Sequence, residues 1–178
     1  MTDGGTPLPG YDAILLAGGS GTRLGGIDKS ALLVGGRSLA ARSASALAGA
    51  DRLILVGPRR DDVAADVVTR EEPAGGGPAA AVAAGFGYVQ ADVVVVLAAD
   101  LPFVSAAAVD RLRLELAARA SIDVAIAIDG AGRDQSLLAA WRSASLRTAL
   151  RGVTAGTPMR AVLAAAGGVE RVGVAALA

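Results

Sequence analysis

The chain has 178 residues, 53% of them hydrophobic, which is enough sequence for one domain with a substantial core. Seventeen basic residues balance seventeen acidic ones, so the composition excludes the basic surface of a general nucleic-acid binder. The absence of cysteine and histidine excludes disulfides, thiol nucleophiles, zinc–thiolate sites and imidazole bases. Any chemistry therefore rests on carboxylates, lysine, arginine and the backbone.

Residues 1–10 are polar and rich in proline and glycine, and we expect a flexible segment there, ahead of a single domain over residues 11–178. This start lacks the charged head and apolar stretch of a signal peptide. Alanine supplies 41 of the hydrophobic residues, and every apolar run is interrupted well short of the roughly 18 to 20 residues that a membrane span needs. We therefore expect a cytoplasmic protein with no membrane contact.

Five short apolar runs predict buried strands, at residues 11–17, 52–57, 67–70, 92–97 and 123–128. Their continuous hydrophobicity is typical of a parallel sheet with helices on both faces. Four stretches between and after them predict helices, at residues 38–47, 78–89, 105–119 and 157–166. The alternation predicts a three-layer α/β/α sandwich around a mostly parallel, Rossmann-like sheet, with ligands at the carboxyl ends of the strands.

The last two predicted helices are flanked by residues that are typical of helix ends. Ser105 is typical of an N-cap. Thr157 followed by Pro158 predicts an N-cap and a proline at the first helical position. Gly167 and Gly168 predict the end of that helix.

The first predicted strand runs into a loop crowded with glycine. Residues 16–29 read Leu-Ala-Gly-Gly-Ser-Gly-Thr-Arg-Leu-Gly-Gly-Ile-Asp-Lys. Such a loop exposes successive backbone N–H groups that can bind phosphate oxygens, and Arg23 and Lys29 add positive charge. The spacing matches neither the P-loop nor the dinucleotide-binding fingerprint. An ordinary glycine-rich turn is the alternative.

Lys29 is the only lysine among the seventeen basic residues. A composition so rich in alanine, glycine and arginine replaces surface lysines wherever arginine will serve. Arginine does not serve where a compact ammonium must fit a tight pocket, because the guanidinium is larger and planar. Lys29 is therefore a candidate functional residue, and chance survival on a solvated surface is the alternative.

A second candidate site follows the fourth predicted strand. Residues 97–103 read Leu-Ala-Ala-Asp-Leu-Pro-Phe, which places Asp100 where ligands bind in such sheets. A carboxylate site without histidine or cysteine favours Mg²⁺, which takes one or two carboxylates together with substrate phosphates and waters. The alternative is a turn or helix-capping role for Asp100.

Three stretches together resemble one family. Residues 16–24 match the L-A-G-G-x-G-T-R-[LM] signature of sugar-nucleotide-type nucleotidyltransferases, and Lys29 lies where that superfamily places its lysine. Residues 25–29 resemble the G-G-x-D-K motif of the molybdenum cofactor guanylyltransferases. Residues 100–103 resemble that family's D-[LMT]-P-[FY] motif, whose Asp binds magnesium. The resemblance thus implies the nucleotide-diphospho-sugar transferase fold, with Asp100 as the metal ligand and Mg²⁺ as the cofactor.

The resemblance also implies an activity: transfer of GMP from GTP to a molybdopterin acceptor, with release of pyrophosphate. It implies catalytic roles for Lys29, Arg23 and Asp100. The implied nucleotide-binding residues are Leu16, Ala17, Gly18, Gly19, Gly21, Lys29, Glu72 and Asp100. Glu72 belongs to a stretch, residues 71–79, that is similar to a nucleotide-contacting loop in which the family usually has Asp.

Several alternatives stay open at this point. Residues 129–136 resemble the family segment that faces the acceptor, but they also read as a plain turn. The family's C-terminal T-P-E segment is not found in these 178 residues. A cytidylyltransferase, a transferase for another small phosphate acceptor, or a catalytically silent nucleotide-binding module would each fit. The sequence does not fix an oligomeric state.

Overall fold

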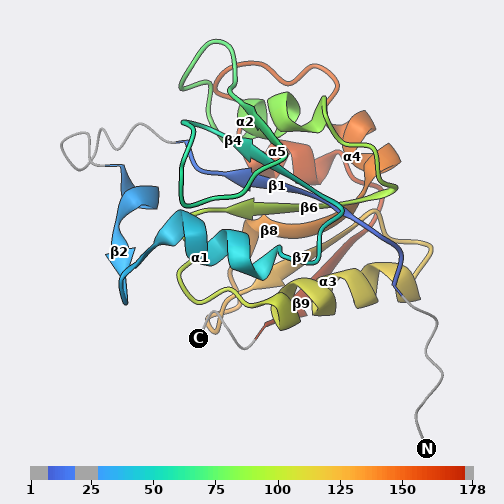
Figure 1. The fold of residues 1–178 in the computed structure, drawn as a ribbon. Coiled ribbons are helices and arrows are strands. Elements are labelled where there is room, and N and C mark those ends of the chain that lie inside the picture. Colours follow the sequence, from blue (N-terminus) through green and yellow to red (C-terminus); the bar gives the residue numbers. More distant parts are fainter. Residues whose placement is uncertain (1–7, 19–27, 175–178) are drawn as a thin grey trace, which may run out of the picture.

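A seven-stranded sheet forms the middle layer of the molecule (Figure 1). The computed structural model describes residues 8–18 and 28–174. In sheet order, the strands are β5 (Val67–Thr69), β4 (Arg52–Val56), β1 (Asp12–Leu16), β6 (Val93–Ala98), β8 (Asp134–Arg142), β7 (Val124–Ile128) and β9 (Val169–Gly173). Pairing within this sheet is parallel except on the two sides of β8. The prediction of a mostly parallel sheet is confirmed.

Helices cover both faces of this sheet. One face carries α1 (Leu39–Ala46) and α3 (Ala106–Ala118). The other carries α2 (Pro78–Phe86), α4 (Ser143–Ala149) and α5 (Met159–Ala164). Consecutive β1 residues point to opposite faces, so Leu15 packs in the first core and Ile14 in the second. This confirms the three-layer α/β/α sandwich.

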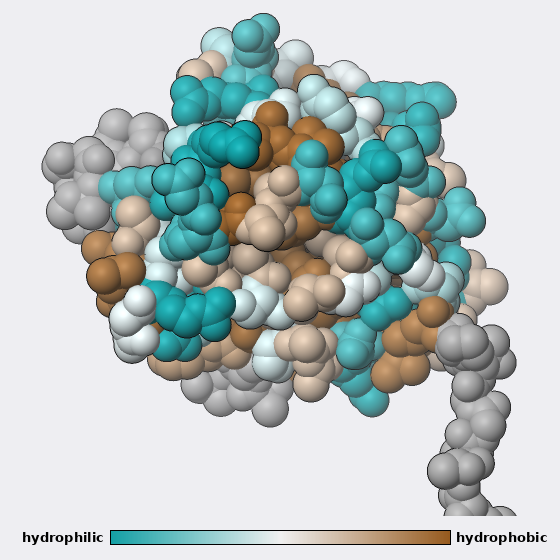
Figure 2. All heavy atoms as spheres, viewed as in Figure 1, coloured by the Kyte–Doolittle hydropathy of each residue, from teal (hydrophilic) through white to brown (hydrophobic). Residues whose placement is uncertain are grey.

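A short hairpin stands apart from the layers. It follows the 3-10 turn η2 (Lys29–Ala31) and consists of β2 (Leu33–Val34) and β3 (Arg37–Ser38). The side chains of Leu32 and Leu33 are 47% and 70% exposed. Figures 1 and 2 show the hairpin projecting at the left, where hydrophobic atoms reach the surface. Packing against the core therefore contributes little to holding it in place.

Each of the five predicted strands is present, with two differences. β5 lies at the edge of the sheet and is partly exposed rather than buried, because it has a neighbour on one side alone. The structure also contains strands that the apolar runs did not indicate: β2, β3, β8 and β9. Residues 129–136 form a turn that runs into β8.

The predicted N-cap of α3 is confirmed, and the predicted start and end of α5 are wrong. The Ser105 hydroxyl accepts the Ala108 N–H at 3.3 Å and caps α3 as predicted. Thr157 does not cap α5, because its hydroxyl accepts the Thr154 N–H at 3.1 Å and closes the preceding turn. Gly167 does not end α5 directly, since the helix stops at Ala164. In the ranges 8–18 and 28–174, no helix has the length and hydrophobicity to cross a membrane.

Gly85 lets α2 approach the sheet closely, and this makes a testable prediction. A Cβ at Gly85 would lie 2.8 Å from methyl groups of both Ile14 and Val56. Gly to Ala within a helix normally stabilises by about 1 kcal/mol, but overpacking a core costs about 1–3 kcal/mol. We expect Gly85→Ala to lower the free energy of unfolding in urea, and Gly87→Ala, whose Cβ meets nothing closer than 3.5 Å, to leave it unchanged or higher. Equal effects of the two substitutions would contradict the prediction.

Candidate functional site

Three parallel strands end side by side at one edge of the sheet. Leu16 at the end of β1 lies opposite Val56 of β4 and Ala98 of β6. The pairing continues beyond the strands, because the Ala17 N–H donates to Val56 and the Ala99 N–H donates to Leu16, both at 2.9 Å. The connection that leaves β1 runs through α1, and the one that enters β6 runs through α2, on the opposite face. Ligands bind at such a switch point in open α/β sheets.

The glycine loop begins at this edge. Leu16 and Ala17 are buried, and their carbonyl oxygens already accept hydrogen bonds from within the protein. Gly18 is the first exposed residue of the motif, so its backbone is accessible to a ligand. The other predicted residues of the loop lie outside the described part of the chain, and they are Gly19, Gly21 and Arg23.

Gly57, which the sequence analysis did not single out, lies against the start of this loop. Its φ of +140° belongs to the region that favours glycine. A Cβ at this position would lie 2.6 Å from the Gly18 nitrogen and 2.7 Å from the Ala17 carbonyl carbon. The end of β4 can therefore pack against the glycine loop because position 57 has no side chain. In the sequence, Val-Gly-Pro after a strand reads as an ordinary turn.

Lys29 is brought to the same edge by a short turn. It opens η2, whose N-cap Asp28 accepts the Ser30 N–H at 3.0 Å. The Ser30 hydroxyl donates to the Ala17 carbonyl at 3.1 Å, which joins this turn to the end of β1. Lys29 itself is exposed, and its ammonium forms no ion pair with a carboxylate of the described residues. It is free to bind an anionic ligand.

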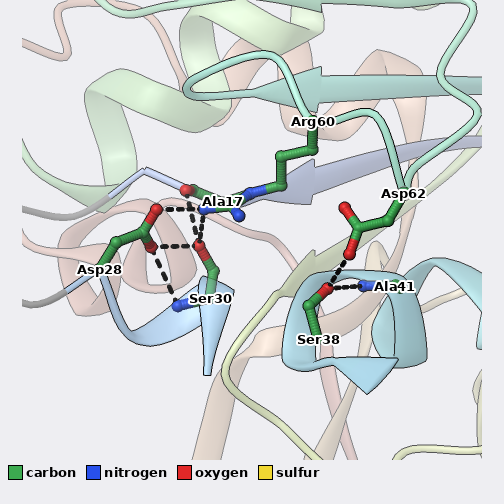
Figure 3. A network of polar contacts seen from close by, with 7 residues as sticks. All are labelled: Ala17, Asp28, Ser30, Ser38, Ala41, Arg60 and Asp62. Carbon is green, nitrogen blue, oxygen red and sulfur yellow. Dashed lines mark hydrogen bonds and ion pairs between the residues drawn. The ribbon is translucent and has the colours of Figure 1, made fainter. Parts of the chain in front are cut away.

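An arginine from the β4–β5 loop, whose side chain is 9% exposed, holds the Lys29 turn (Figure 3). Arg60 forms an ion pair with Asp28 and also donates a hydrogen bond to the Ser30 hydroxyl. Partial burial raises the pKa of the Asp28 carboxyl, but hydrogen bonds from Ser30 and Arg60 outweigh burial, and the pKa lies below its ordinary value of 3.8. Asp28 is therefore ionised at neutral pH, as the ion pair requires.

The same loop contacts the far end of the segment that contains Lys29. The Ser38 hydroxyl donates to the Asp62 carboxylate at 2.5 Å. It also accepts the Ala41 N–H at 3.0 Å, which makes Ser38 the N-cap of α1. Residues 28–38 are thus attached to the β4–β5 loop at both ends.

Asp100 follows β6 at this edge, as predicted. It is exposed, and no hydrogen bond or ion pair joins its carboxylate to another residue in ranges 8–18 and 28–174. The preceding residue, Ala99, bonds to Leu16, while Ser30, which follows Lys29, bonds to Ala17. Asp100 and Lys29 are therefore each one residue away from a residue that is bonded to the end of β1.

The donor set can be compared with what Mg²⁺ requires. No group of three or more acidic side chains in the described residues could hold a metal by itself. Mg²⁺ characteristically takes one or two carboxylates and completes its shell with waters and substrate phosphates. A single exposed Asp100 near the start of the glycine loop fits this second arrangement.

Glu72 follows β5, the edge strand of the sheet. It lines a surface pocket of about 810 Å³ together with Thr69, Arg70 and the outer face of α2. Thr69 ends β5 at the same carboxyl edge of the sheet, opposite Val56 of β4, which in turn lies opposite Leu16 of β1. Glu72 thus follows β5 at the edge that also carries Gly18, Lys29 and Asp100, two strands along from β1. Its predicted nucleotide contact stays a prediction.

The segment at residues 129–136 has two parts. The Asp129 carboxylate accepts the N–H groups of Ala131 and Arg133 and pairs with the Arg133 guanidinium at 2.8 Å. The backbone hydrogen bond from Arg133 is the main cause that lowers the pKa of Asp129. This part is a turn that uses its own carboxylate. Ser136, at the other end, lines a pocket of about 500 Å³ with Pro78, Thr157 and Arg160.

The direction of β8 places this second pocket near the edge of the sheet where the parallel strands end. Because β8 runs antiparallel to β6, its first residues lie at the carboxyl ends of the parallel strands, with Leu138 opposite Leu97. Gly77 and Pro78 at the start of α2 form the facing wall. Its volume lies within the range of small-molecule sites, roughly 300–1,000 Å³.

Comparison with known proteins agrees with this geometry. A curated relative, the molybdenum cofactor guanylyltransferase of Shewanella amazonensis, is 32% identical over 124 residues. The match covers 67% of this chain and 63% of the relative, so the chain spans less than two thirds of that relative's length.

Two solved structures show the same fold. The molybdopterin-guanine dinucleotide biosynthesis protein A of Archaeoglobus fulgidus has a TM-score of 0.66 at 20% identity, over 92% of this chain and 83% of that one. The 2-C-methyl-D-erythritol 4-phosphate cytidylyltransferase of Thermus thermophilus has a TM-score of 0.67 at 22% identity, over 93% and 89%. The predicted nucleotide-diphospho-sugar transferase fold is thereby confirmed.

The family itself is shown by sequence. The model of the MobA-like NTP transferase domain matches residues 13–171, which run from β1 into β9 and include both Lys29 and Asp100. We conclude that the chain belongs to the MobA-like NTP transferase family.

Proposed function

We propose that this chain transfers GMP from GTP to a molybdopterin acceptor and releases pyrophosphate. The observation that carries the proposal is that Lys29 and Asp100 each adjoin a residue bonded to the end of β1, where the glycine loop begins. The family membership supports a nucleotidyl transfer, and the guanylyltransferase name of the Shewanella relative supports GTP and molybdopterin as the substrates.

In the proposed reaction, an oxygen of the acceptor phosphate attacks the α-phosphorus of the nucleotide. The bond from that phosphorus to the bridging oxygen breaks, and pyrophosphate leaves with its electron pair. Phosphoryl-type transfer depends chiefly on alignment and charge neutralisation, which suits a chain without cysteine or histidine. No covalent intermediate with the protein is required.

Each candidate residue of the sequence analysis near the end of β1 or β6, or in the glycine motif, has a part in this scheme. Gly18, Gly19 and Gly21 would bind the phosphates and the base through the backbone. The Lys29 ammonium would neutralise charge on the phosphates in the transition state, and Arg23 would bind the leaving pyrophosphate. Asp100 would hold Mg²⁺, whose charge stabilises the phosphate oxygens when it is bound.

The pocket between the starts of α2 and α5 is our candidate for the acceptor. Its hydroxyl groups on Ser136 and Thr157 and the guanidinium of Arg160 are groups that bind phosphate-bearing molecules. Its place at the start of β8 also agrees with the acceptor-facing role that the family resemblance implies for residues 129–136.

A second activity has support of its own. The likeness in fold to a cytidylyltransferase favours CTP and a different phosphate acceptor as the alternative within the same chemistry. A nucleotide-binding module without turnover is the alternative from another class. Both alternatives keep the fold and the position of Lys29. Base preference separates guanylyl from cytidylyl transfer, and turnover separates an enzyme from a binding module.

The test compares turnover with GTP, CTP, ATP and UTP in the presence of Mg²⁺ and molybdopterin. Turnover is measured as the release of pyrophosphate. A site that hydrogen-bonds the edge of guanine leaves its own groups unpaired with another base, so we expect GTP to be preferred over CTP and ATP by orders of magnitude in kcat/KM. Calorimetry with each nucleotide and Mg²⁺ should give the same order.

Three results would overturn parts of the proposal. A preference for CTP would move the protein to cytidylyl transfer. Tight binding of GTP without pyrophosphate release under any condition would make it a binding module. Equal affinity for all four nucleotides would remove the guanylyltransferase assignment.

A further inference from the structure

Burial in the segment that carries Lys29 is confined to two serines. Between residues 28 and 38, Ser30 and Ser38 are 7% and 4% exposed, and every other residue is exposed. Both serines are bonded to the β4–β5 loop, Ser30 to Arg60 and Ser38 to Asp62 (Figure 3). Hydrogen bonds to this loop, and not apolar packing, therefore fix where the segment lies.

Burying the Arg60 guanidinium costs free energy, so a contribution to stability does not by itself explain this residue. Its side chain is 9% exposed, and its Nε atom has no hydrogen-bond partner among the residues that the structure describes. Removing a guanidinium from water carries a large cost, and replacing a buried ion pair by an apolar residue of similar volume is often neutral or stabilising. Asp28, its partner, is 46% exposed and can be solvated without Arg60.

The contacts of Arg60 bracket Lys29. One nitrogen of its guanidinium reaches Asp28, the residue before Lys29, and Ser30, the residue after it. Ser30 in turn is bonded to the Ala17 carbonyl at the end of β1. The backbone on both sides of Lys29 is thus tied to the strand ends that form the candidate site.

We propose that Arg60 is a positioning residue, which fixes the Lys29 ammonium at the phosphate site by holding Asp28 and Ser30. This inference rests on the proposed function, because it takes Lys29 to act on the phosphates. Arg60 itself touches no substrate in this scheme. Its effect should therefore appear in the catalytic step, where a misplacement of about 1 Å can cost on the order of 100-fold.

The first experiment compares Arg60→Met with Arg59→Met in the full chain. Methionine replaces the unbranched apolar stem of the side chain and removes its charge and donors. We expect Arg60→Met to lower kcat with GTP by about 10-fold to 100-fold, with KM for GTP and Tm close to those of the wild type. Arg59 is the matched control, because it is the adjacent arginine and is exposed. Arg59→Met should leave kcat unchanged.

Two further variants test the route of the effect. Lysine at position 60 restores a charged nitrogen donor, but its ammonium does not reach as far from the backbone as the outer nitrogens of a guanidinium, so Arg60→Lys should recover part of the lost kcat. If Arg60 acts through Asp28, the losses from Arg60→Met and Asp28→Asn will not add in the double variant. Additive losses, or an unchanged kcat in Arg60→Met, would overturn the proposal.

Hydrogen exchange tests the positioning without any turnover. The amides of Ser30, Ala31 and Leu32 donate within the η2 turn to Asp28 and Lys29. We expect Arg60→Met to speed their exchange, measured by NMR, at least tenfold and to leave the strand amides of β1 unchanged. If the wild type shows no turnover, the proposed function fails, and this exchange result still decides the role of Arg60. Unaltered exchange at residues 30–32, or faster exchange throughout the sheet, would overturn the positioning role.

Discussion

Lys29→Ala should lower kcat for nucleotidyl transfer by about 100-fold to 1000-fold, the usual cost of removing one electrostatic contact from a transition state. The loss should fall on kcat and kcat/KM together, because the ammonium acts on charge that develops during the reaction. Tm should change little, since Lys29 is exposed and pairs with no described carboxylate. Pyrophosphate release and thermal unfolding of the same preparation measure both quantities.

Lys29→Arg is the decisive companion variant. A planar guanidinium keeps the charge but does not reproduce a compact point charge, so this variant should also be impaired. Full activity in Lys29→Arg would show that the single lysine is an accident of composition. Because no other lysine is present, labelling by an amine-reactive reagent can be measured on the peptide that contains Lys29, apart from the N-terminal amine, and bound GTP with Mg²⁺ should protect Lys29.

Asp100→Asn should abolish the magnesium-dependent activity. The substitution keeps the size of the side chain and removes the charge that would hold the metal. Asp100 is exposed and has no partner among residues 8–18 and 28–174, so Tm without metal and nucleotide should stay close to that of the wild type. Turnover measured against Mg²⁺ concentration, with chelator as the metal-free reference, checks the first part.

Asp92→Asn provides the control for this substitution. Asp92 immediately precedes β6 and Asp100 lies just beyond its end, so the two carboxylates belong to opposite edges of the sheet. Both are exposed. Asp92→Asn should therefore retain the magnesium dependence of the wild type. If Asp100→Asn shows that same dependence, the metal ligand is a different carboxylate.

The layers of the fold could be predicted from the sequence because buried parallel strands are continuous apolar runs. The run at residues 92–97, for example, became the buried strand β6. β8 was missed although its sequence, DQSLLAAWR, contains the apolar run LLAAW, because a short run rich in leucine and alanine does not by itself distinguish a strand from a helix. Its antiparallel place between β6 and β7 depends on pairing with strands far away along the chain. Local pattern carries no information about such pairing.

The residues of the candidate site also differ in whether the sequence predicts them. Gly18, Lys29 and Asp100 stand out because they belong to short local motifs. Arg60 does not, since Arg59 and Arg60 are adjacent and chemically identical, yet one is exposed and the other is buried against Asp28. That difference arises from a contact across 32 residues of chain. No feature of the local sequence distinguishes the two arginines.

The central position of β1 has a consequence for the synthesis of this protein. β1 is made before both of the strands that it pairs with, β4 and β6, and the last residue of β6 is Ala98. The sequence of β1, DAILL, is fully buried in the finished sheet but has no complete set of partners until residue 98 has been made. Nascent chains expose an unpaired apolar strand during that interval, which is the condition under which misassembly and chaperone binding occur. Domains that place their first strand at an edge avoid this interval.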